Sequence, residues 1–234
     1  MKFDEQLLSP FMDTYFGYGN LKSDFWYVGM EEGGDTSEDR IHEMLNHWRE
    51  NGQYQTKTLK HGRSTLQKTW EKLIKIHLSS KQEGNPSIEE VRQYHQDQLG
   101  QESDCLVELF PLPSPGMKKW SYKNWKLNEI NFLDSRKNYR QKLGPTRVET
   151  LKQLIAEHRP KVVLFYGKQY QSYWNQITSV QTEEWKLFDQ LKFPVMIHQT
   201  AFTLYVSIAH VGGARGVTNQ FLYDVGKLIK EHRP

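Results

Sequence analysis

Four apolar runs, rich in β-branched and aromatic residues, stand out along the chain and predict buried strands. They span residues 24–30, 105–112, 161–166 and 193–209. The last run is long enough for two strands, with a break near 199–203. Polar stretches at 51–62, 79–86 and 118–138 have the composition of loops or insertions and not of linkers between domains.

Segments with helical spacing of apolar residues lie between these runs. The predicted helices are 37–50, 64–78 with Ser64 as its N-cap, a short helix opened by the capping box of Ser87 and Glu90, 147–158 and 217–232. Strands that alternate with helices need crossover connections, so they predict a mostly parallel sheet covered on both faces. We therefore expect one α/β domain over residues 1–234, a three-layer α/β/α sandwich.

Composition narrows the class of protein without identifying it. The chain has 234 residues, 37% of them hydrophobic, and a formal net charge of +3, which is too small to indicate a nucleic-acid binder. Its single cysteine, Cys105, excludes an internal disulfide framework, a four-cysteine zinc site and an iron–sulfur cluster within one chain. Neither a signal peptide nor a membrane-spanning apolar run is recognisable, so we expect a soluble cytoplasmic protein with no membrane partner.

Each predicted strand runs into a polar or glycine-rich segment. These segments are Gly29 to Asp35, Glu108 to Pro115, Gly167, and His210 to Gly216. In a parallel sheet the carboxyl ends of the strands share one edge, where ligands bind. The four segments are therefore expected to meet in one cleft.

Three of these features have both a chemical and a structural interpretation. The acids between Gly29 and Asp35 are suited to orienting water or accepting a proton, or they form an acidic turn that caps the next helix. His210 is suited to stabilising a developing anion, or it is a buried histidine bonded to backbone. Glu108 lies in an apolar strand, where a carboxylate is costly unless it is paired or in a cleft, and the apolar neighbours favour a cleft over an exposed edge.

A basic segment, residues 118–126, alternates lysines with aromatic residues. Lys118, Lys119 and Lys123 are suited to phosphates and Trp120 to base stacking, as in proteins that bind single-stranded nucleic acid. The alternative is a solvated loop whose tryptophans anchor it to the core.

The strand-end motifs together resemble the uracil-DNA glycosylase superfamily. Gly29-Met30-Glu31-Glu32-Gly33 resembles the glycine-bounded first motif, in the form of the single-strand-selective monofunctional branch. Residues 105–112 resemble the strand that reads the base, and 160–167 resemble a Pro-Lys-Val strand that ends in glycine. Residues 210–215 resemble the second catalytic motif.

The resemblance implies a role for each position. Glu31 corresponds to the residue that positions the attacking water, His210 to the histidine that stabilises the leaving base, and Glu108 to the base-reading residue. Arg215 corresponds to the residue that fills the space left by the flipped base. The remaining expected contacts to substrate come from Gly29, Met30, Gly33, Phe110, Gly167, Gly212 and Gly213. No metal or organic cofactor is implied, and the implied partner is DNA, single-stranded in that branch.

The chain also departs from the family pattern. Glu31 replaces Asn or Asp, Glu32 replaces a proline, and Glu108 replaces an amide that both donates and accepts hydrogen bonds. The second motif lacks its proline and serine. Three functions therefore stay open: a divergent monofunctional DNA glycosylase that hydrolyses an N-glycosidic bond, a non-catalytic binding protein with the same fold, and a metal-assisted phosphoesterase that uses Glu31, Glu32, Asp35 and Glu108.

Overall fold

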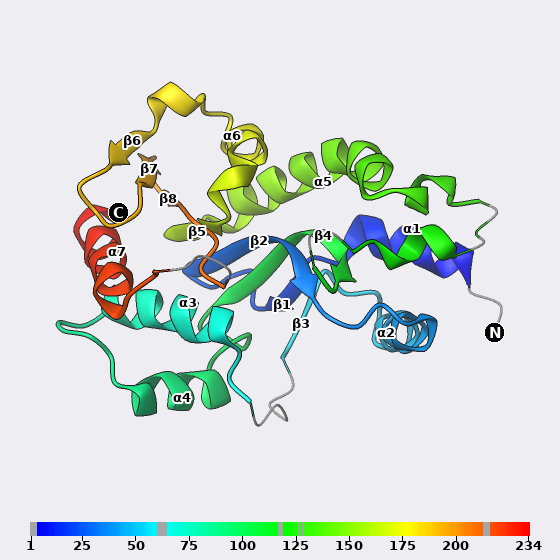
Figure 1. Ribbon diagram of the computed structural model, residues 1–234, viewed down its shortest axis with the longest axis horizontal. Helices are drawn as coiled ribbons and strands as arrows, with labels where there is room; N and C mark the ends of the chain where they lie inside the picture. Colours follow the sequence, from blue (N-terminus) through cyan, green and yellow to red (C-terminus); the bar gives the residue numbers. More distant parts are fainter. Residues whose placement is uncertain (1–3, 60–64, 117–118, 126, 128, 213–215) are drawn as a thin grey trace.

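The computed structural model describes residues 4–59, 65–116, 119–125, 127, 129–212 and 216–234. Within them a single mixed sheet runs through the molecule (Figure 1). Its strands are β1 (Gly17–Gly19), β2 (Phe25–Gly33), β3 (Thr56–Lys57), β4 (Cys105–Ser114), β5 (Val162–Tyr166), β6 (Lys186–Phe188), β7 (Val195–Gln199) and β8 (Leu204–Ile208). Their order across the sheet is β3-β1-β4-β2-β5-β8-β7-β6.

The four central strands β4, β2, β5 and β8 are parallel to one another. Antiparallel pairing is confined to the flanks, where β1 pairs with β4, β7 with β8 and β6 with β7. The prediction of an α/β fold with a mostly parallel sheet is thus confirmed. The parallel arrangement brings four strand carboxyl ends to one edge of the sheet.

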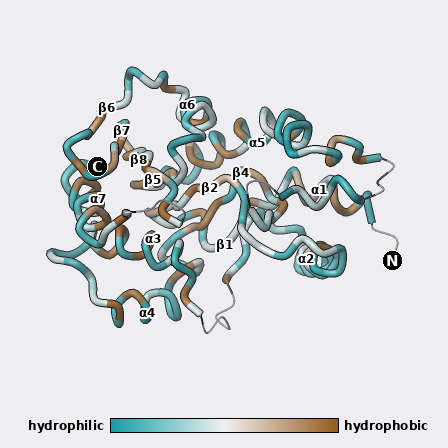
Figure 2. Tube along the Cα trace, in the orientation of Figure 1, coloured by the Kyte–Doolittle hydropathy of each residue, from teal (hydrophilic) through white to brown (hydrophobic). Residues whose placement is uncertain are grey.

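Helices pack on both faces of this sheet. They are α1 (Glu5–Thr14), α2 (Glu38–Glu50), α3 (Lys68–Ser79), α4 (Ile88–Asp97), α5 (Arg136–His158), α6 (Gln171–Thr178) and α7 (Asn219–His232). Side chains of β2 alternate between the faces: Trp26 and Val28 pack in one apolar cluster with α1, α2, α5 and α6, whereas Phe25 and Tyr27 pack in a second cluster with α3, α4 and α7. Figure 2 shows apolar residues along the central strands and polar residues on helix surfaces such as α2.

Most predicted elements are confirmed. β2, β4 and β5 occupy the first three apolar runs, and the fourth run forms the β7–β8 hairpin with its break at 200–203. Ser37 caps α2 by accepting a hydrogen bond from the Arg40 N–H, and the capping box of Ser87 and Glu90 opens α4. The local signals of these elements agree with their packing.

Three expectations about boundaries are wrong. α3 begins at Lys68, after an N-cap at Gln67 that makes no side-chain cap bond, and Ser64 lies outside the described residues. α5 begins at Arg136 and includes Pro145, which interrupts the helical pattern and hides the first half of the helix from sequence reading. The predicted loop at 118–138 contains the short 3-10 helices Ser121–Asn124 and Asn131–Asp134.

Of the helices in the described ranges, none combines the length and the apolar character that a bilayer crossing requires.

Candidate active site at the carboxyl ends of the parallel strands

A cavity of about 630 Å³ lies at the carboxyl ends of the central strands. Strand β2 contributes Met30 to Gly33, β4 contributes Glu108, β5 contributes Tyr166, and the segment after β8 contributes His210. Helices α3 and α5 complete the walls with Trp70, Arg136 and Arg140, among others. The expected meeting of the strand-end segments in one cleft is therefore confirmed for β2, β4 and β8, and for β5 through Tyr166, the residue before Gly167.

Glu31 is held by two arginines of α5. Arg140 Nη2 and Nε donate to Glu31 Oε1 at 2.6 and 2.9 Å, and Arg136 Nε lies 3.7 Å from Glu31 Oε2. The Glu31 side chain is only 6% exposed. A carboxylate in these surroundings is fixed in position, and the hydrogen bonds to Arg140 engage Oε1 alone.

Glu108 lines the same cavity with a different set of contacts. Tyr166 Oη donates to Glu108 Oε1 at 2.7 Å. Glu108 Oε2 is buried and has no hydrogen-bond partner among the described residues. Burial is the main cause that raises the pKa of Glu108 to about 8; the Tyr166 bond opposes the shift, and the charges of Glu32 and Glu31 add to it. The carboxyl group is therefore mostly neutral at pH 7.

Gly29 makes room for the Glu108–Tyr166 pair. A Cβ atom at residue 29 would collide with Tyr166 Oη and with Glu108 Oε2. The residue lies in β2 directly opposite Glu108 in the parallel register. Glycine is thus required here for close approach of two side chains to the backbone, and not for a turn.

Arg147 supports the cavity wall from behind Glu108. Its fully buried guanidinium donates to the carbonyl oxygens of Leu109 at 2.7 Å, Glu108 at 2.9 Å and Met12 at 3.1 Å. It also lies 3.6 Å from the Phe16 ring centroid. The β1–β4 ladder ends at Val107, so Arg147 satisfies carbonyl groups that lie beyond it.

His210 follows β8 and lines the same cavity. Burial lowers the pKa of His210, and the nearby Lys72 adds to the shift, so the imidazole is neutral at pH 7. Its ring centroid lies 5.9 Å from that of Tyr166. Lys72 Nζ of α3 donates a hydrogen bond to the Val211 carbonyl at 2.8 Å. Thr69 of α3 packs against Gly212, where a Cβ atom would collide with its hydroxyl. Residues 211–212, which follow His210, are therefore held against α3.

The other predicted contact residues have mixed outcomes. Met30 and Gly33 line the cavity. Gly167, at a φ of +131°, donates its N–H to the Ile208 carbonyl and joins the ends of β5 and β8. Phe110 is fully buried against Tyr139 and is not among the cavity-lining residues. Gly213, Arg215 and Lys118 lie outside the described residues.

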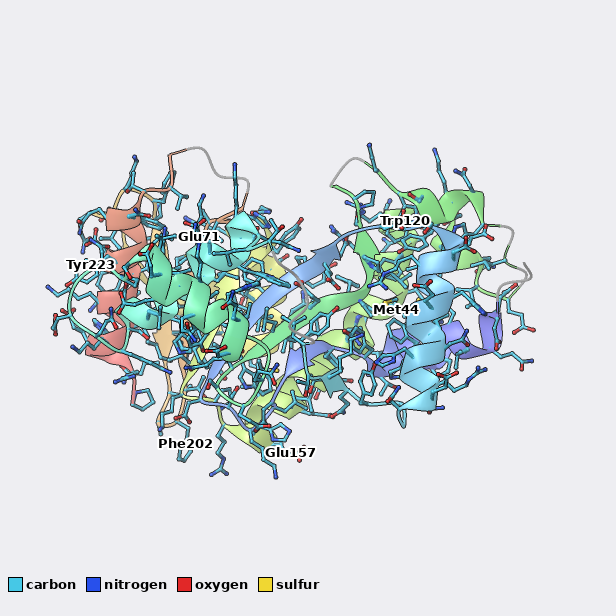
Figure 3. All side chains as sticks on the ribbon, turned by 90° about the horizontal axis from the view of Figure 1, so that it is seen from below. Met44, Glu71, Trp120, Glu157, Phe202 and Tyr223 are labelled. Atoms are coloured by element: carbon cyan, nitrogen blue, oxygen red, sulfur yellow. The ribbon has the colours of Figure 1, made fainter. Side chains whose placement is uncertain are left out.

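The basic segment before α5 is anchored through its aromatic residues. Trp120 (labelled in Figure 3) donates its indole N–H to the Leu133 carbonyl at 2.7 Å and packs against Tyr122 and Tyr139. Lys119 and Lys123 are exposed. The tryptophan is therefore part of the packing, as the structural interpretation predicts, and the two described lysines remain accessible.

The acids near Gly33 have separate partners. Asp35 accepts hydrogen bonds from the N–H and hydroxyl of Ser37 at 2.9 and 2.8 Å, so it supports the start of α2. Glu32 accepts from Tyr18 Oη at 3.2 Å, and Glu31 binds the α5 arginines. Within the described ranges no group of three histidine, cysteine or acidic side chains is arranged to hold a metal ion.

Sequence reasoning missed Arg136, Arg140, Arg147 and Tyr166. Their partners lie far away along the chain, and three of the four stand in a helix whose pattern is interrupted by proline.

Neither a scan against protein-family models nor a search of curated proteins found a match to this chain.

Proposed function

We propose that the protein is a divergent DNA glycosylase that hydrolyses the N-glycosidic bond of a deaminated or damaged base, with the strand-end cavity as its active site. The observation that carries the proposal is the meeting of Glu31, Glu108 and His210 around one cavity, each from a different motif of the resemblance. The proposal includes a three-layer, uracil-DNA glycosylase-like arrangement of the fold.

His210 is the proposed stabiliser of the leaving base. As the C1′–N bond breaks, its electron pair moves to the base, which becomes anionic. The neutral imidazole keeps one ring N–H, and this N–H donates a hydrogen bond to the developing negative charge. A lowered pKa favours this role, because it keeps the His210 imidazole in the neutral form.

Glu31 is the proposed partner of the attacking water. Its Oε2 atom accepts a hydrogen bond from the water while Arg140 holds Oε1. The water oxygen bonds to C1′, one of its protons stays on the new sugar hydroxyl, and the other is transferred to the departing base. The carboxylate also favours the positive charge that develops on the sugar.

The test is cleavage of end-labelled single-stranded oligonucleotides that each carry one uracil, hypoxanthine or xanthine. The reaction contains EDTA, and alkali is added afterwards. Breaks at the lesion that depend on alkali are expected from the wild type and are expected to fall at least about a hundredfold in His210→Ala and in Glu31→Gln.

Matched controls are available outside the cavity. His158 ends α5 at the opposite edge of the sheet, and Glu157 is exposed (Figure 3), so His158→Ala and Glu157→Gln are expected to retain activity. Cleavage that needs Mg²⁺ or Mn²⁺ would instead support the phosphoesterase reading.

One observation favours a second candidate, a non-catalytic binding protein with the same fold. Glu31 Oε1 already accepts two hydrogen bonds from Arg140, and the carboxylate is only 6% exposed, so the protein itself engages the group that would meet the water. This candidate predicts that the oligonucleotides bind but that no base is released at any lesion.

A further inference from the structure

A second hollow lies at the opposite edge of the sheet from the candidate active site. It has a volume of about 610 Å³ and is built at the amino ends of β2, β4 and β5, together with the segments that follow α3 and α7. We call it the amino-edge hollow. Asp24 at its wall and Glu31 of the candidate active site are separated by the length of β2, roughly 20 Å, so one small ligand cannot occupy both sites.

Four basic side chains from four separate segments line the amino-edge hollow. Lys22 stands in the turn before β2, Lys81 follows α3, Lys161 precedes β5 and Arg233 follows α7. These segments are far apart along the chain and meet only through the fold. Positive charges that converge on a concave surface attract anions.

The two acidic side chains of the hollow have protein partners. Asp24 Oδ2 lies 2.7 Å from Lys161 Nζ, and Glu102 Oε2 accepts a hydrogen bond from Asn20 Nδ2 at 2.5 Å. Each carboxylate keeps a second oxygen that can accept from a ligand hydroxyl. The wall therefore offers acceptors beside its cations.

The other three cations have no such partner. Lys22, Lys81 and Arg233 form no ion pair with any residue that the structure describes. Partial burial lowers the pKa of Lys81; the charge of Asp104 opposes this shift, and the charge of Arg233 adds to it. Lys81 and Arg233 thus repel each other across the hollow, and an anion between them would relieve that repulsion.

The ends of α3 and α7 account for part of this charge. A helix C-terminus carries about half a negative charge and favours a cation nearby, so two helix ends balance about one of the three cations. They give no reason for Lys22, which stands in a turn between strands, to meet the other two.

The lining also indicates the kind of anion. Among the described residues of the wall, Phe25 is the one aromatic residue, and it is only 4% exposed, so a nucleobase finds no ring face on which to stack. Ser103 adds a hydroxyl group to the wall. A compact, polar ligand fits this lining better than a nucleotide does.

We propose that the amino-edge hollow binds a small phosphorylated polyol. Its phosphate group accepts hydrogen bonds from Lys22, Lys81 and Arg233, and its hydroxyl groups donate to the carboxylates of Asp24 and Glu102. The volume of about 610 Å³ is in the range of small-molecule sites. This site is separate from the proposed glycosylase cavity, and the inference does not depend on base release.

The test is titration of the ¹⁵N-labelled full chain with glycerol 3-phosphate at low salt and pH 7.5, followed by protein NMR. Saturable shifts are expected in the amides of residues 22–25, 80–82, 102–104 and 161–162, with residues 30–33 and 209–212 unchanged. Inorganic phosphate should shift the same amides with at least about threefold weaker affinity, and glycerol should shift none of them.

Variants assign the binding to individual side chains. Lys81→Gln and Arg233→Gln each remove one cation, so each should weaken the affinity for glycerol 3-phosphate about fivefold. Lys142→Gln makes the same change of charge on the exposed face of α5 and should stay within about twofold of wild type. Glu102→Gln should reduce the preference for glycerol 3-phosphate over inorganic phosphate, a ratio in which the change of net charge cancels.

Several outcomes would overturn the inference. They are the absence of saturable shifts, shifts confined to residues 30–33 and 209–212, or equal losses of affinity in Lys142→Gln and Lys81→Gln. Equal affinities for inorganic phosphate and glycerol 3-phosphate would overturn the assignment to a polyol. An oligonucleotide without a terminal phosphate that shifts the same amides would assign the hollow to nucleic acid instead.

Discussion

Two buried carboxyl groups at β4, those of Asp104 and Glu108, differ in the hydrogen bonds that the protein gives them. Asp104 directly precedes the strand, and its oxygens accept hydrogen bonds from the Gly100 N–H at 2.7 Å and from Tyr94 Oη at 2.9 Å. Glu108, within the strand, receives one such bond and keeps an unsatisfied oxygen. Burial raises the pKa of both, to about 6 for Asp104 and about 8 for Glu108.

The raised pKa therefore does not by itself identify a functional group. Asp104 belongs to a buried network in which Tyr94 also approaches His77, and His77 Nδ1 lies 2.8 Å from Tyr27 Oη. Every contact there comes from the protein, as expected of a structural network. Glu108 differs because its second oxygen lacks a protein partner and because it lines a cavity. That pair of features distinguishes a candidate site from a satisfied core group.

The largest expected effect comes from removing the support behind Glu108. Arg147→Met leaves the carbonyls of Leu109, Glu108 and Met12 without their donor, so we expect a loss of about 3 kcal/mol or more in the free energy of unfolding. Urea denaturation measures it. Exposed Arg92 on α4 provides the control, with Arg92→Met expected within about 0.5 kcal/mol of wild type. A loss below about 1 kcal/mol for Arg147→Met would show that these bonds are dispensable.

The two carboxyls should respond differently to conversion into amides. Asp104→Asn places an NH₂ group where an acceptor is needed, so we expect a loss of about 1–3 kcal/mol at pH 4, where ionisation of either carboxyl adds little. Glu108→Gln keeps the acceptor for Tyr166 and is expected to change stability by less than about 1 kcal/mol at the same pH. Thermal and urea unfolding compare them. Equal losses would remove the distinction between a satisfied and an unsatisfied group.

Their pH windows separate the two groups further. Each folded pKa lies above the ordinary value, 3.8 for Asp104 and 4.5 for Glu108, so the folded state binds more protons and loses stability as pH rises. The Asp104 contribution is lost between about pH 4 and 6, and the Glu108 contribution between about pH 4.5 and 8. For one proton the slope does not exceed about 1.4 kcal/mol per pH unit.

Unfolding free energies of both variants, compared with wild type at each pH, test these windows. Glu108→Gln should remove a downward slope between pH 6.5 and 8 that Asp104→Asn leaves in place. A slope in that range common to wild type and Glu108→Gln would assign it to another group.

The smallest expected effects concern the surface beside the cavity. Lys119→Gln and Lys123→Gln should each reduce the salt dependence of single-stranded DNA binding by about 0.7 in the slope of log affinity against log salt. Lys22, exposed just before β2 at the opposite edge of the sheet, is the matched control. An equal change in Lys22→Gln would show that nucleic acid binds without preference for the cavity end.

The features that could be predicted from the sequence are those with a strong local pattern of apolar residues. The runs that form β2, β4 and β5 are apolar enough to predict strands, and parallel strands bring their ends together, so the cavity and its residues Glu31, Glu108 and His210 followed from the sequence. The cost of a carboxylate in an apolar strand also pointed to Glu108.

The remaining features depend on contacts between distant segments. Tyr166 meets Glu108 only because β5 and β4 flank β2, and Gly29 was assigned to substrate contact when its space is taken by that pair. Phe110 lies two residues after Glu108 in the same strand, but its side chain packs in the core against Tyr139 and does not line the cavity. No spacing rule along the chain reports such pairs.

The central claim, that Glu108 is a neutral acid at pH 7, is tested most directly by its own titration. Protein labelled with ¹³C at the glutamate carboxyl carbon is followed by NMR from pH 4 to 10, with Glu108→Gln assigning the signal. We predict a midpoint near 8, well separated from the exposed glutamates. A midpoint near 4.5 would mean that Glu108 is ionised at pH 7, and the contrast with Asp104 would fail.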